Sequence, residues 1–470
     1  MSDPPRTVAV VLAAGAGSRF GGAKLLAELD GRPLLDHVLA AIQAAGLAEI
    51  LVVLGPGSAA LEAISVARGA GIVRNPAPER GLSSSVRVGL DAISGPFDAA
   101  LIALADQPRT TGSAIRALLA AEIPAGRQIV LPRYAGGGGG NPVLLLRAAW
   151  HLAAGLSGDR GFGPLIAEHP ELVLHVDLPE DNPDVDTPAD LARIITGGWA
   201  ARVEANRVQV ERVREVPDGA DFYAPVRSLF RADPTRTDDP VLAGLLDAVQ
   251  PGDRWIDVGA GAGRYALPIA RALAGTGGEV IAVDASPSML GSMNEIAREF
   301  EITNVRPIEA RWPPAGRAVD LAGPMDVALI AQVGYDIPEI GPFLDALEAV
   351  ARRECIAVLM ERVPASAADP FWPSVHGETR APLPALPEFL EVLGSRGRRP
   401  TVSRVGNDGR VFESRAGLEG FVRRQLWIDP DGPKEARYQA TLASLAVESG
   451  GGWTIAGRLP NEIGIVRWTP

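Results

Sequence analysis

Short apolar runs alternate with longer stretches of helical character between residue 7 and about residue 195. Apolar runs bounded by turn residues predict buried strands, and apolar positions three and four residues apart predict helices. This alternation predicts a largely parallel sheet with helices on both faces. The predicted strands are Val8–Leu12, Ile50–Leu54, Ala99–Leu104, Ile129–Pro132 and Leu172–Val176, and the predicted helices are Leu34–Ala45, Ser84–Ala92 and Ala114–Ala121.

A second series with the same rhythm begins at Arg254–Val258. Residues 198–216 between the two series are charged and lack a sheet pattern, and Pro217–Ala220 is a turn signal. We therefore expect two α/β domains, residues 1–197 and 220–470, joined by a linker at residues 198–219. The other elements predicted in the second domain are the strands Glu279–Val283, Val327–Ala331, Cys355–Met360 and Glu462–Trp468 (an edge strand), and the helices Phe222–Phe230, Pro240–Val249, Ala266–Leu273 and Ser288–Phe300.

The composition is that of a globular chain, with 47% hydrophobic and 22% charged residues among 470. The 45 Lys and Arg residues against 57 Asp and Glu give a net charge of −12, so we expect no binding to nucleic acid or to an anionic membrane. The single cysteine, Cys355, excludes internal disulfides and a cysteine-rich zinc site. The chain shows no signal peptide and no apolar run near the roughly 20 residues of a membrane span, so we expect a cytoplasmic protein.

Lysine is rare in this chain, because 43 of the 45 basic residues are arginine and only Lys24 and Lys434 are lysine. We interpret this as a coding bias that turns lysine into arginine wherever either residue serves. A lysine that is kept against this bias indicates that the compact ammonium group itself is needed.

A glycine-rich loop follows the first predicted strand, where backbone N–H groups can turn toward a phosphate. A dinucleotide loop would have glycine in place of Phe20, and a phosphate-binding P-loop would not have Ala23 before the lysine. The order Leu-Ala-Ala-Gly-x-Gly-x-Arg-x-Gly-x-x-Lys-Leu-Leu resembles the signature of MobA-like nucleotidyltransferases instead. The resemblance implies that the triphosphate is neutralised by Arg19 and Lys24 and that the nucleotide is bound by Leu12, Ala13, Ala14, Gly15 and Gly17.

Two aspartates match further segments of the same family. Asp106 ends a buried strand in Asp-Gln-Pro, and Asp186 lies in Asp-Val-Asp-Thr-Pro near the end of the first domain. The resemblance implies that both carboxylates hold Mg²⁺, which prefers hard oxygen ligands and bridges phosphate oxygens. The alternatives stay open: Asp106 as a turn residue, and Asp186 as the N-cap of a helix, a role that Thr187 could also take.

Three more segments follow in family order. Ser83 and Ser84 resemble the residues near the base and ribose, although a serine at a helix start is also a common N-cap. Gly140 and Asn141, in Gly-Gly-Asn-Pro, and Asp159, in Gly-Asp-Arg-Gly, resemble the segments that face the acceptor substrate. Each of these two segments could equally be a surface turn.

The double alanine of the first loop, together with Gly-Asn-Pro and Asp-x-Asp-Thr-Pro, fits the cytidylyltransferase branch of the family. That branch implies transfer of CMP from CTP to molybdopterin, with Mg²⁺ as cofactor and a molybdoenzyme as the eventual recipient. A phosphate oxygen of the acceptor would attack the α-phosphorus in line and release pyrophosphate. Because that oxygen is already anionic, catalysis would consist of alignment and charge neutralisation without a protein nucleophile.

The second glycine loop begins after Arg254–Val258 and reads Asp-Val-Gly-Ala-Gly-Ala-Gly-Arg. It resembles the first motif of class I methyltransferases, which use S-adenosylmethionine (SAM). The resemblance implies that SAM is bound by Asp257, Gly259, Gly261, Gly263, Asp284 and Glu309. An NAD site or an empty turn remains the alternative for the glycines, and a helix cap for Asp284. Polar candidates for a small acceptor's pocket are Gln332, Tyr335 and His376.

These observations predict two Rossmann-like α/β/α domains of three layers, a nucleotidyltransferase fold followed by a class I methyltransferase fold. Two other functions stay open. The first domain could act on a sugar phosphate, or one half could be a sensor that binds nucleotide or SAM without catalysis. The sequence leaves the oligomeric state, the phosphate acceptor and the methyl acceptor open.

Overall fold

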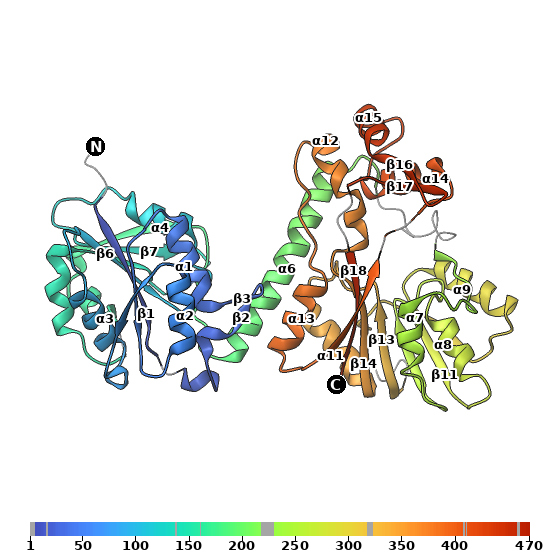
Figure 1. Cartoon of the computed structure of the whole chain (residues 1–470), viewed down its shortest axis with the longest axis horizontal. Helices are drawn as coiled ribbons and strands as arrows, with labels where there is room; N and C mark the ends of the chain where they lie inside the picture. The colour runs from blue at the N-terminus through green and yellow to red at the C-terminus, as the bar shows by residue number, and fades with distance from the viewer. Residues whose placement is uncertain are drawn as a thin grey trace. The chain divides into compact units, whose positions relative to one another are not determined.

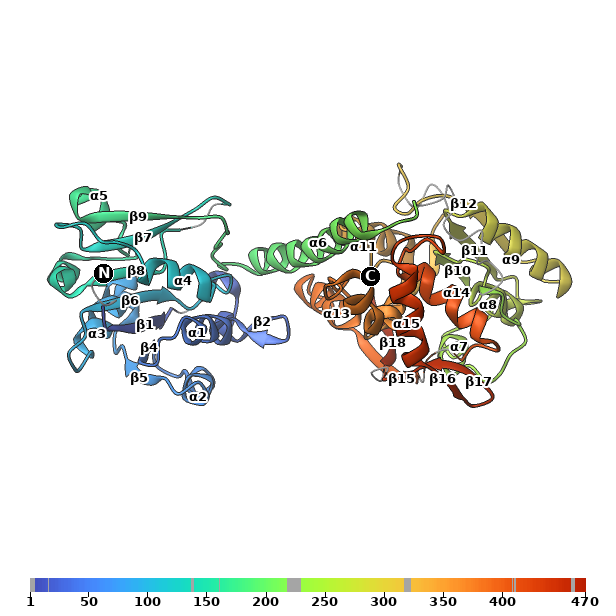
Figure 2. The same cartoon turned by 90° about the horizontal axis from the view of Figure 1, so that it is seen from above.

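The computed structural model divides into two compact units, Met1–Arg193 and Ile194–Pro470 (Figures 1 and 2). The structure describes residues 5–15, 17–136, 139–159, 161–217, 230–316, 323–407, 409, 411–457 and 461–470. Most of the helix predicted at Phe222–Phe230 and the end of the predicted linker lie outside these ranges. Within them, no helix has both the length and the apolar composition needed to cross a membrane.

The first unit is built on a seven-stranded sheet with the order β5-β4-β1-β6-β8-β7-β9. Strand β8 runs antiparallel to both of its neighbours, and the other pairs are parallel. A two-stranded hairpin, β2 and β3, stands apart from this sheet. The strands are β1 (Thr7–Ala13), β2 (Glu28–Leu29), β3 (Arg32–Pro33), β4 (Ile50–Leu54), β5 (Gly71–Arg74), β6 (Ala99–Leu104), β7 (Ile129–Tyr134), β8 (Val143–Leu146) and β9 (Val173–Leu178).

Helices cover both faces of this sheet because each of its strands carries apolar side chains on both sides. One core packs α1 and α4 against the sheet, and the other packs α3 and η4 against the opposite face (Figure 1). The helical elements are η1 (Ser18–Phe20), η2 (Lys24–Leu26), α1 (Leu34–Ala44), α2 (Ala59–Ala67), η3 (Pro78–Arg80), α3 (Leu82–Asp91), α4 (Gly112–Leu119), η4 (Arg147–Gly155), α5 (Gly163–Glu168) and η5 (Pro170–Leu172).

Residues 198–213, most of the predicted linker, are helical and belong to the 26-residue helix α6 (Pro188–Val213). One side of this helix is buried at intervals of three to four residues, and these positions include polar side chains that disguise the pattern. In the second unit Trp199 packs against Phe389, and its indole N–H donates to the carbonyl of Ile337 at 2.8 Å. The buried positions of this side are Trp199, Val203, Asn206, Gln209 and Val213.

The second unit contains a seven-stranded sheet with the order β12-β11-β10-β13-β14-β18-β15. The first five strands are parallel, and β18 is antiparallel to both β14 and β15. Because β15 takes the edge, the prediction that Glu462–Trp468 is an edge strand is wrong. The strands are β10 (Arg254–Val258), β11 (Glu279–Asp284), β12 (Val305–Glu309), β13 (Met325–Ala331), β14 (Ala351–Met360), β15 (Thr401–Asn407), β16 (Ala446–Ser449), β17 (Gly452–Ile455) and β18 (Asn461–Trp468).

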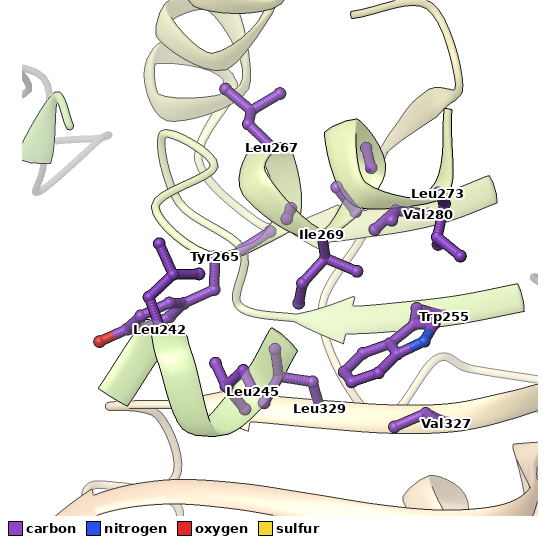
Figure 3. Packing of buried hydrophobic residues seen from close by; sticks show 14 of the residues in the cluster. Leu242, Leu245, Trp255, Tyr265, Leu267, Ile269, Leu273, Val280, Val327 and Leu329 are labelled. Atoms are coloured by element: carbon purple, nitrogen blue, oxygen red, sulfur yellow. The ribbon is translucent and has the colours of Figure 1, made fainter. Parts of the chain in front are cut away.

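The core on one face of this sheet contains Trp255 together with side chains of the covering helices α7 and α8 (Figure 3). A separate small core joins α12, α14, α15 and the hairpin of β16 and β17. The helices are α7 (Pro240–Leu246), α8 (Ala266–Leu273), α9 (Pro287–Glu299), α11 (Ile340–Val350), η7 (Pro364–Phe371), α12 (Trp372–His376), α13 (Leu386–Ser395), α14 (Arg415–Gln425) and α15 (Glu435–Leu445). The predicted fold class, two α/β/α domains, is confirmed.

Candidate functional site

A cluster of opposite charges lies at the carboxyl end of β6 in the first unit. The ammonium of Lys24 is 2.6 Å from Oδ2 of Asp106 and 3.3 Å from Oδ1 of Asp186. The other oxygen of Asp186 is 3.3 Å from the guanidinium of Arg19. The Lys24 side chain is 13% exposed, whereas the Arg19 side chain is 75% exposed. The structure therefore brings together four residues that the sequence placed in one site, from segments more than 160 residues apart.

Backbone geometry explains how the first glycine loop presents Lys24. Gly17 has a φ of +59°, and a β-carbon there would lie 3.1 Å from the carbonyl oxygen of Gly22. The backbone N–H of Lys24 donates to the same carbonyl at 2.8 Å, which closes the loop. The next side chain, Leu25, is buried in the core against α1. Glycine allows the tight turn, and the buried leucine anchors the short helix η2 that carries the lysine.

The start of α6 settles the alternative that was left open for Asp186. The hydroxyl of Thr187 accepts a hydrogen bond from the backbone N–H of Asp190 at 3.2 Å, and the Asp190 carboxylate accepts from the backbone N–H of Thr187 at 2.8 Å. This reciprocal pair is a capping box. Thr187 is thus the N-cap, and the side chain of Asp186 binds Lys24 and Arg19.

The sequence did not single out a buried polar network beside these charges. Asn182 is fully buried, and its amide donates to Oε1 of Gln107 at 3.2 Å and to the backbone carbonyl of Asn141 at 3.2 Å. The amide of Gln107 donates to Asp184 at 2.9 Å, and the hydroxyl of Tyr134 donates to the carbonyl of Asn141 at 3.0 Å. The network links the loop after β6 to the loop before α6 and to the predicted acceptor segment.

Two pKa values reflect this environment. Burial, together with the charges of Asp106 and Asp186, raises the pKa of Asp184 above its usual range. Burial also raises the pKa of Tyr134 to about 12, so its hydroxyl stays a hydrogen-bond donor at neutral pH. A pocket of about 360 Å³ opens beside this tyrosine, and its walls are Arg133, Tyr134, Ala135, Asp177, Leu178 and Pro179.

The remaining predicted nucleotide-binding residues offer mainly backbone. The side chains of Leu12, Ala13 and Ala14 are buried, whereas Gly15 is exposed. Ser83 and Ser84 are also buried, at 1% and 6% exposed. The hydroxyl of Ser84 donates to the carbonyl of Gly81 at 2.9 Å and accepts from the Asn75 amide at 2.8 Å, which is a structural role at the helix start. The hydroxyl of Ser83 has no partner among the described residues.

Of the predicted acceptor residues, Asp159 packs against the start of α3. Its carboxylate accepts from the backbone N–H of Leu82 at 3.1 Å, and the carbonyl of Gly158 accepts from the backbone N–H of Ser83 at 3.1 Å. Asn141 instead contacts the buried network through its backbone. Gly140 lies beside it, with Leu131 as the neighbour nearest to its missing β-carbon. Arg160 lies outside the described residues.

The donor set at the charge cluster fits Mg²⁺. Oxygens of Asp106 and Asp186 converge on one ammonium, so they lie no further apart than the sum of its two contact distances. Carboxylate oxygens are the ligands that Mg²⁺ prefers, and this ion commonly takes only one or two of them from the protein. Among the described residues, no group of three or more His, Cys, Asp and Glu side chains could hold a metal ion.

In the second unit, Asp284 ends β11 beside the second glycine loop. Its Oδ2 accepts from the backbone N–H of Gly261 and its Oδ1 from that of Ser286, both at 2.8 Å. The hydroxyl of Ser286 caps α9, so the helix cap is not Asp284 itself. Glu309, at the end of the adjacent β12, is exposed and lies opposite Asp284 in the strand register.

The glycines of the second loop all have positive φ and tight surroundings. A β-carbon on Gly259 would lie 2.3 Å from Cγ2 of Val333, and one on Gly263 would lie 2.7 Å from Met293. At Gly261 it would lie 3.1 Å from Met289. Gly259 and Gly263 are therefore required both by conformation and by packing, whereas Gly261 is required by its conformation.

Asp257 is a buried carboxylate below this loop. It is 2% exposed, and its Oδ1 has no hydrogen-bond partner among the described residues. Burial, aided by the charge of Asp284, raises the pKa of Asp257 to about 7, although a backbone hydrogen bond from Ala266 favours the charged form. Burial thus favours the neutral, protonated form of this carboxyl group.

The predicted acceptor candidates of the second unit separate into two places. Tyr335 is buried; its hydroxyl donates to Gln332 at 2.7 Å and accepts from the backbone N–H of Met360 at 2.7 Å. His376 belongs to α12 and lies 4.5 Å from the ring of Trp372. Burial lowers the pKa of His376 to about 4, so its imidazole is neutral at pH 7.

Comparison with known families supports both units. A model of the MobA-like NTP transferase domain matches residues 9–173, and a model of a methyltransferase domain matches residues 250–367. These matches define a transferase-type protein with two α/β domains. The chain belongs to the MobA-like NTP transferase family, and a methyltransferase domain follows the family domain. The resemblances read from the two glycine loops are thus confirmed.

Three known proteins are similar in sequence to the first unit. Nicotine blue oxidoreductase of Paenarthrobacter nicotinovorans is 31% identical over 206 residues, which make up 41% of this chain and 98% of that protein. The bifunctional protein GlmU of Sorangium cellulosum is 40% identical over 114 residues, 23% of this chain but only 24% of GlmU. A solved structure, the Mycobacterium sp. strain JC1 homologue of Mycobacterium tuberculosis rv0371c, is 31% identical with a TM-score of 0.36 and covers 40% of this chain and 94% of its own.

Proposed function

We propose that the first unit transfers the nucleotide of CTP to the terminal phosphate of a molybdopterin-type acceptor and releases pyrophosphate. The observation that supports this most is the convergence of Lys24, Arg19, Asp106 and Asp186. Cations that can neutralise a triphosphate and carboxylates that can hold a divalent metal stand within hydrogen-bonding or ion-pairing distance of one another. Phosphoryl chemistry of this kind needs alignment and charge neutralisation rather than a protein nucleophile.

In this proposal the acidic residues bind the metal, and the basic residues neutralise the phosphates. Asp106 and Asp186 would hold Mg²⁺, which supplies charge neutralisation at the phosphates. Lys24 would neutralise the triphosphate from the buried side and Arg19 from the exposed side. The backbone of residues 12–15 and Gly17 would follow the nucleotide, since the side chains of residues 12–14 face the core. The loop of Gly140 and Asn141, which the buried network ties to the metal-binding segment, would receive the acceptor.

Pyrophosphate release tests this function directly. The full chain is incubated with Mg²⁺, one nucleoside triphosphate at a time, and either molybdopterin or a set of sugar phosphates. We expect release with CTP and molybdopterin, and a loss of at least about 100-fold in Asp106→Asn. The matched control Asp91→Asn changes an exposed aspartate at the end of α3 and should leave the rate unchanged. Release with a sugar phosphate instead would transfer the proposal to that acceptor, and no release with any pair would identify a sensor.

We propose further that the second unit binds SAM and methylates a small acceptor. Support comes from the three glycines at positive φ and from Asp284, whose carboxylate lies beside them and accepts from the backbone N–H of Gly261. Calorimetric titration with SAM should give binding that falls at least about tenfold in Asp284→Ala. The control Asp247→Asn, an exposed residue at the end of α7, should bind as the unchanged chain does. Equal binding in Asp284→Ala would remove the assignment.

A further inference from the structure

The Lys24 ammonium lies between the two carboxylates that would hold the metal. Its distances to Asp106 and Asp186 are 2.6 and 3.3 Å, and its side chain is largely shielded from solvent. Oxygen ligands lie about 2.0–2.1 Å from Mg²⁺. A metal ion bound by the same two oxygens would therefore occupy the space that the ammonium takes in this structure.

The two carboxylates that would hold the metal are already paired with cations. Two carboxylates, Asp106 and Asp186, face two cations, Lys24 and Arg19. A divalent cation that entered alone would meet both cations at short range and would break two ion pairs. A triphosphate changes this pairing, because it brings several negative charges to which both cations can turn.

The structure also gives Lys24 the means to turn. Its backbone is fixed by the buried Leu25, but the ammonium is carried on a flexible four-carbon stem. The residues in front of it include Gly21, with a φ of +77°, where a β-carbon would meet nothing within 4 Å. The backbone of the loop therefore borders open space at Gly21, three residues before the lysine.

We propose that Lys24 is an internal counter-ion that holds the metal position in the nucleotide-free protein, so that metal and nucleotide bind together and each raises the affinity for the other. This inference rests on the proposed nucleotidyl transfer, because it takes Asp106 and Asp186 as the metal ligands. Lys24 leaves the carboxylates when the triphosphate arrives and becomes its partner. The same lysine thus excludes the metal from the empty site and neutralises phosphate in the filled one.

Binding of Mn²⁺ to the full chain, followed by the electron paramagnetic resonance signal of the free ion, tests the proposal without turnover. In the absence of nucleotide, Lys24→Met should bind Mn²⁺ about 5- to 100-fold more tightly than the unchanged chain. CTP should tighten Mn²⁺ binding in the unchanged chain, and this coupling should be lost in Lys24→Met. The double variant Lys24→Met/Asp106→Asn should lose the gain, which places the ion at these carboxylates.

Two control variants test whether the position of the Lys24 ammonium matters, or only the loss of one positive charge. Arg19→Met removes one positive charge from the same cluster but leaves the ammonium in place, so its gain in Mn²⁺ affinity should be several times smaller. Lys434→Met removes the only other lysine, which donates to the carbonyl of Val213 in the second unit, and should change nothing. Equal or weaker Mn²⁺ binding by Lys24→Met, or equal gains in Lys24→Met and Arg19→Met, would overturn the proposal. If the Mn²⁺ experiment failed in either way but CTP-dependent pyrophosphate release were observed, the proposed function would still stand. If the Mn²⁺ experiment gave the expected result but no pyrophosphate were released, only the proposed function would be rejected.

Discussion

The two glycine loops of this chain do different physical work. Both follow the third strand in the order of a seven-stranded sheet, β1 in one unit and β10 in the other. The first loop ends at a charged side chain, Lys24, whose ammonium lies between two carboxylates. In the second loop, close contacts exclude a β-carbon at Gly259 and Gly263, and Asp284 accepts a hydrogen bond from the backbone N–H of Gly261.

This difference teaches that glycine spacing alone does not define a loop's chemistry. A triphosphate with a metal requires charges that can be moved and neutralised, which favours a long cationic side chain. A ligand that lies along the backbone requires close approach and a rigid turn, which favours glycine at positions of positive φ. Substitutions that remove charge should therefore damage the first loop, and substitutions that add a carbon should damage the second.

The largest expected effect comes from removing the cation of the first loop. Lys24→Met should lower the rate of pyrophosphate release by about 10²- to 10³-fold, because a preorganised charge aimed at the reacting phosphates is lost. The corresponding change in the second loop, Arg264→Met, should alter SAM affinity by less than about threefold. The guanidinium of Arg264 is instead paired with Asp239 at 2.9 Å. A SAM affinity that fell as steeply as the transfer rate would abolish the distinction between the loops.

Adding a methyl group should reverse the order of sensitivity. Gly259→Ala should lower the free energy of unfolding of the second unit by about 2 kcal/mol, because its β-carbon would overlap Val333 at a φ of +75°. Gly15→Ala in the first loop should cost less than about 0.5 kcal/mol, since no atom lies within 4 Å of the added carbon. Chemical denaturation measures the first change by tryptophan fluorescence, as seven of the eight tryptophans belong to the second unit. Calorimetry measures the second, and a comparable loss at both positions would contradict the packing argument.

The sequence predicted those elements in which most residues are apolar and the two ends are marked by turn or polar residues. The strands β4, β6 and β10 and the helix α8 begin and end at the predicted residues. The sequence does not predict β5 because Gly71–Arg74 is short and half-buried, and it does not predict β8 because Val143–Leu146 is an apolar run of only four residues. Strand β15 was also not predicted. It lies at the sheet edge, and its residues are mostly exposed and polar, as in a loop.

The candidate site shows the same division. Lys24 and Asp106 could be predicted because each has a defined place after a buried strand. The pairing of Gln107 with Asn182 could not, since the two amides are 75 residues apart and follow no periodic pattern. The one indication in the sequence is that each amide lies in a segment with a predicted metal ligand or close before one. Gln107 lies in Asp-Gln-Pro, and Asn182 lies in Asp-Asn-Pro-Asp.

Protonation should also distinguish the loops, through Asp257. The pKa of this carboxyl is about 7 in the folded protein and near 3.8 when unfolded, so the folded state binds more protons between these values. The group's contribution to stability is therefore unchanged below about pH 4 and falls as pH rises toward 7, by at most about 1.4 kcal/mol per pH unit. Denaturation of Asp257→Asn between pH 5 and 7 should lack this slope relative to the unchanged chain. Parallel pH dependences in the two proteins would show that Asp257 keeps an ordinary pKa.

The smallest expected effect comes from the helix cap beside the charge cluster. It distinguishes the role of the Asp186 carboxylate from the role of Thr187 as N-cap of α6. Thr187→Val removes the hydroxyl that accepts from the Asp190 backbone N–H, and it should cost about 1 kcal/mol in the calorimetric unfolding of the first unit. Thr187→Ser keeps the hydroxyl and should restore most of that stability. Asp186→Asn keeps the cap but removes a charge beside Lys24, so it should lower the transfer rate far more than Thr187→Val does, at little cost in stability. If Thr187→Val and Asp186→Asn reduced transfer equally, the Asp186 carboxylate would have to act through the helix start, and the charge cluster would lose one of its four members.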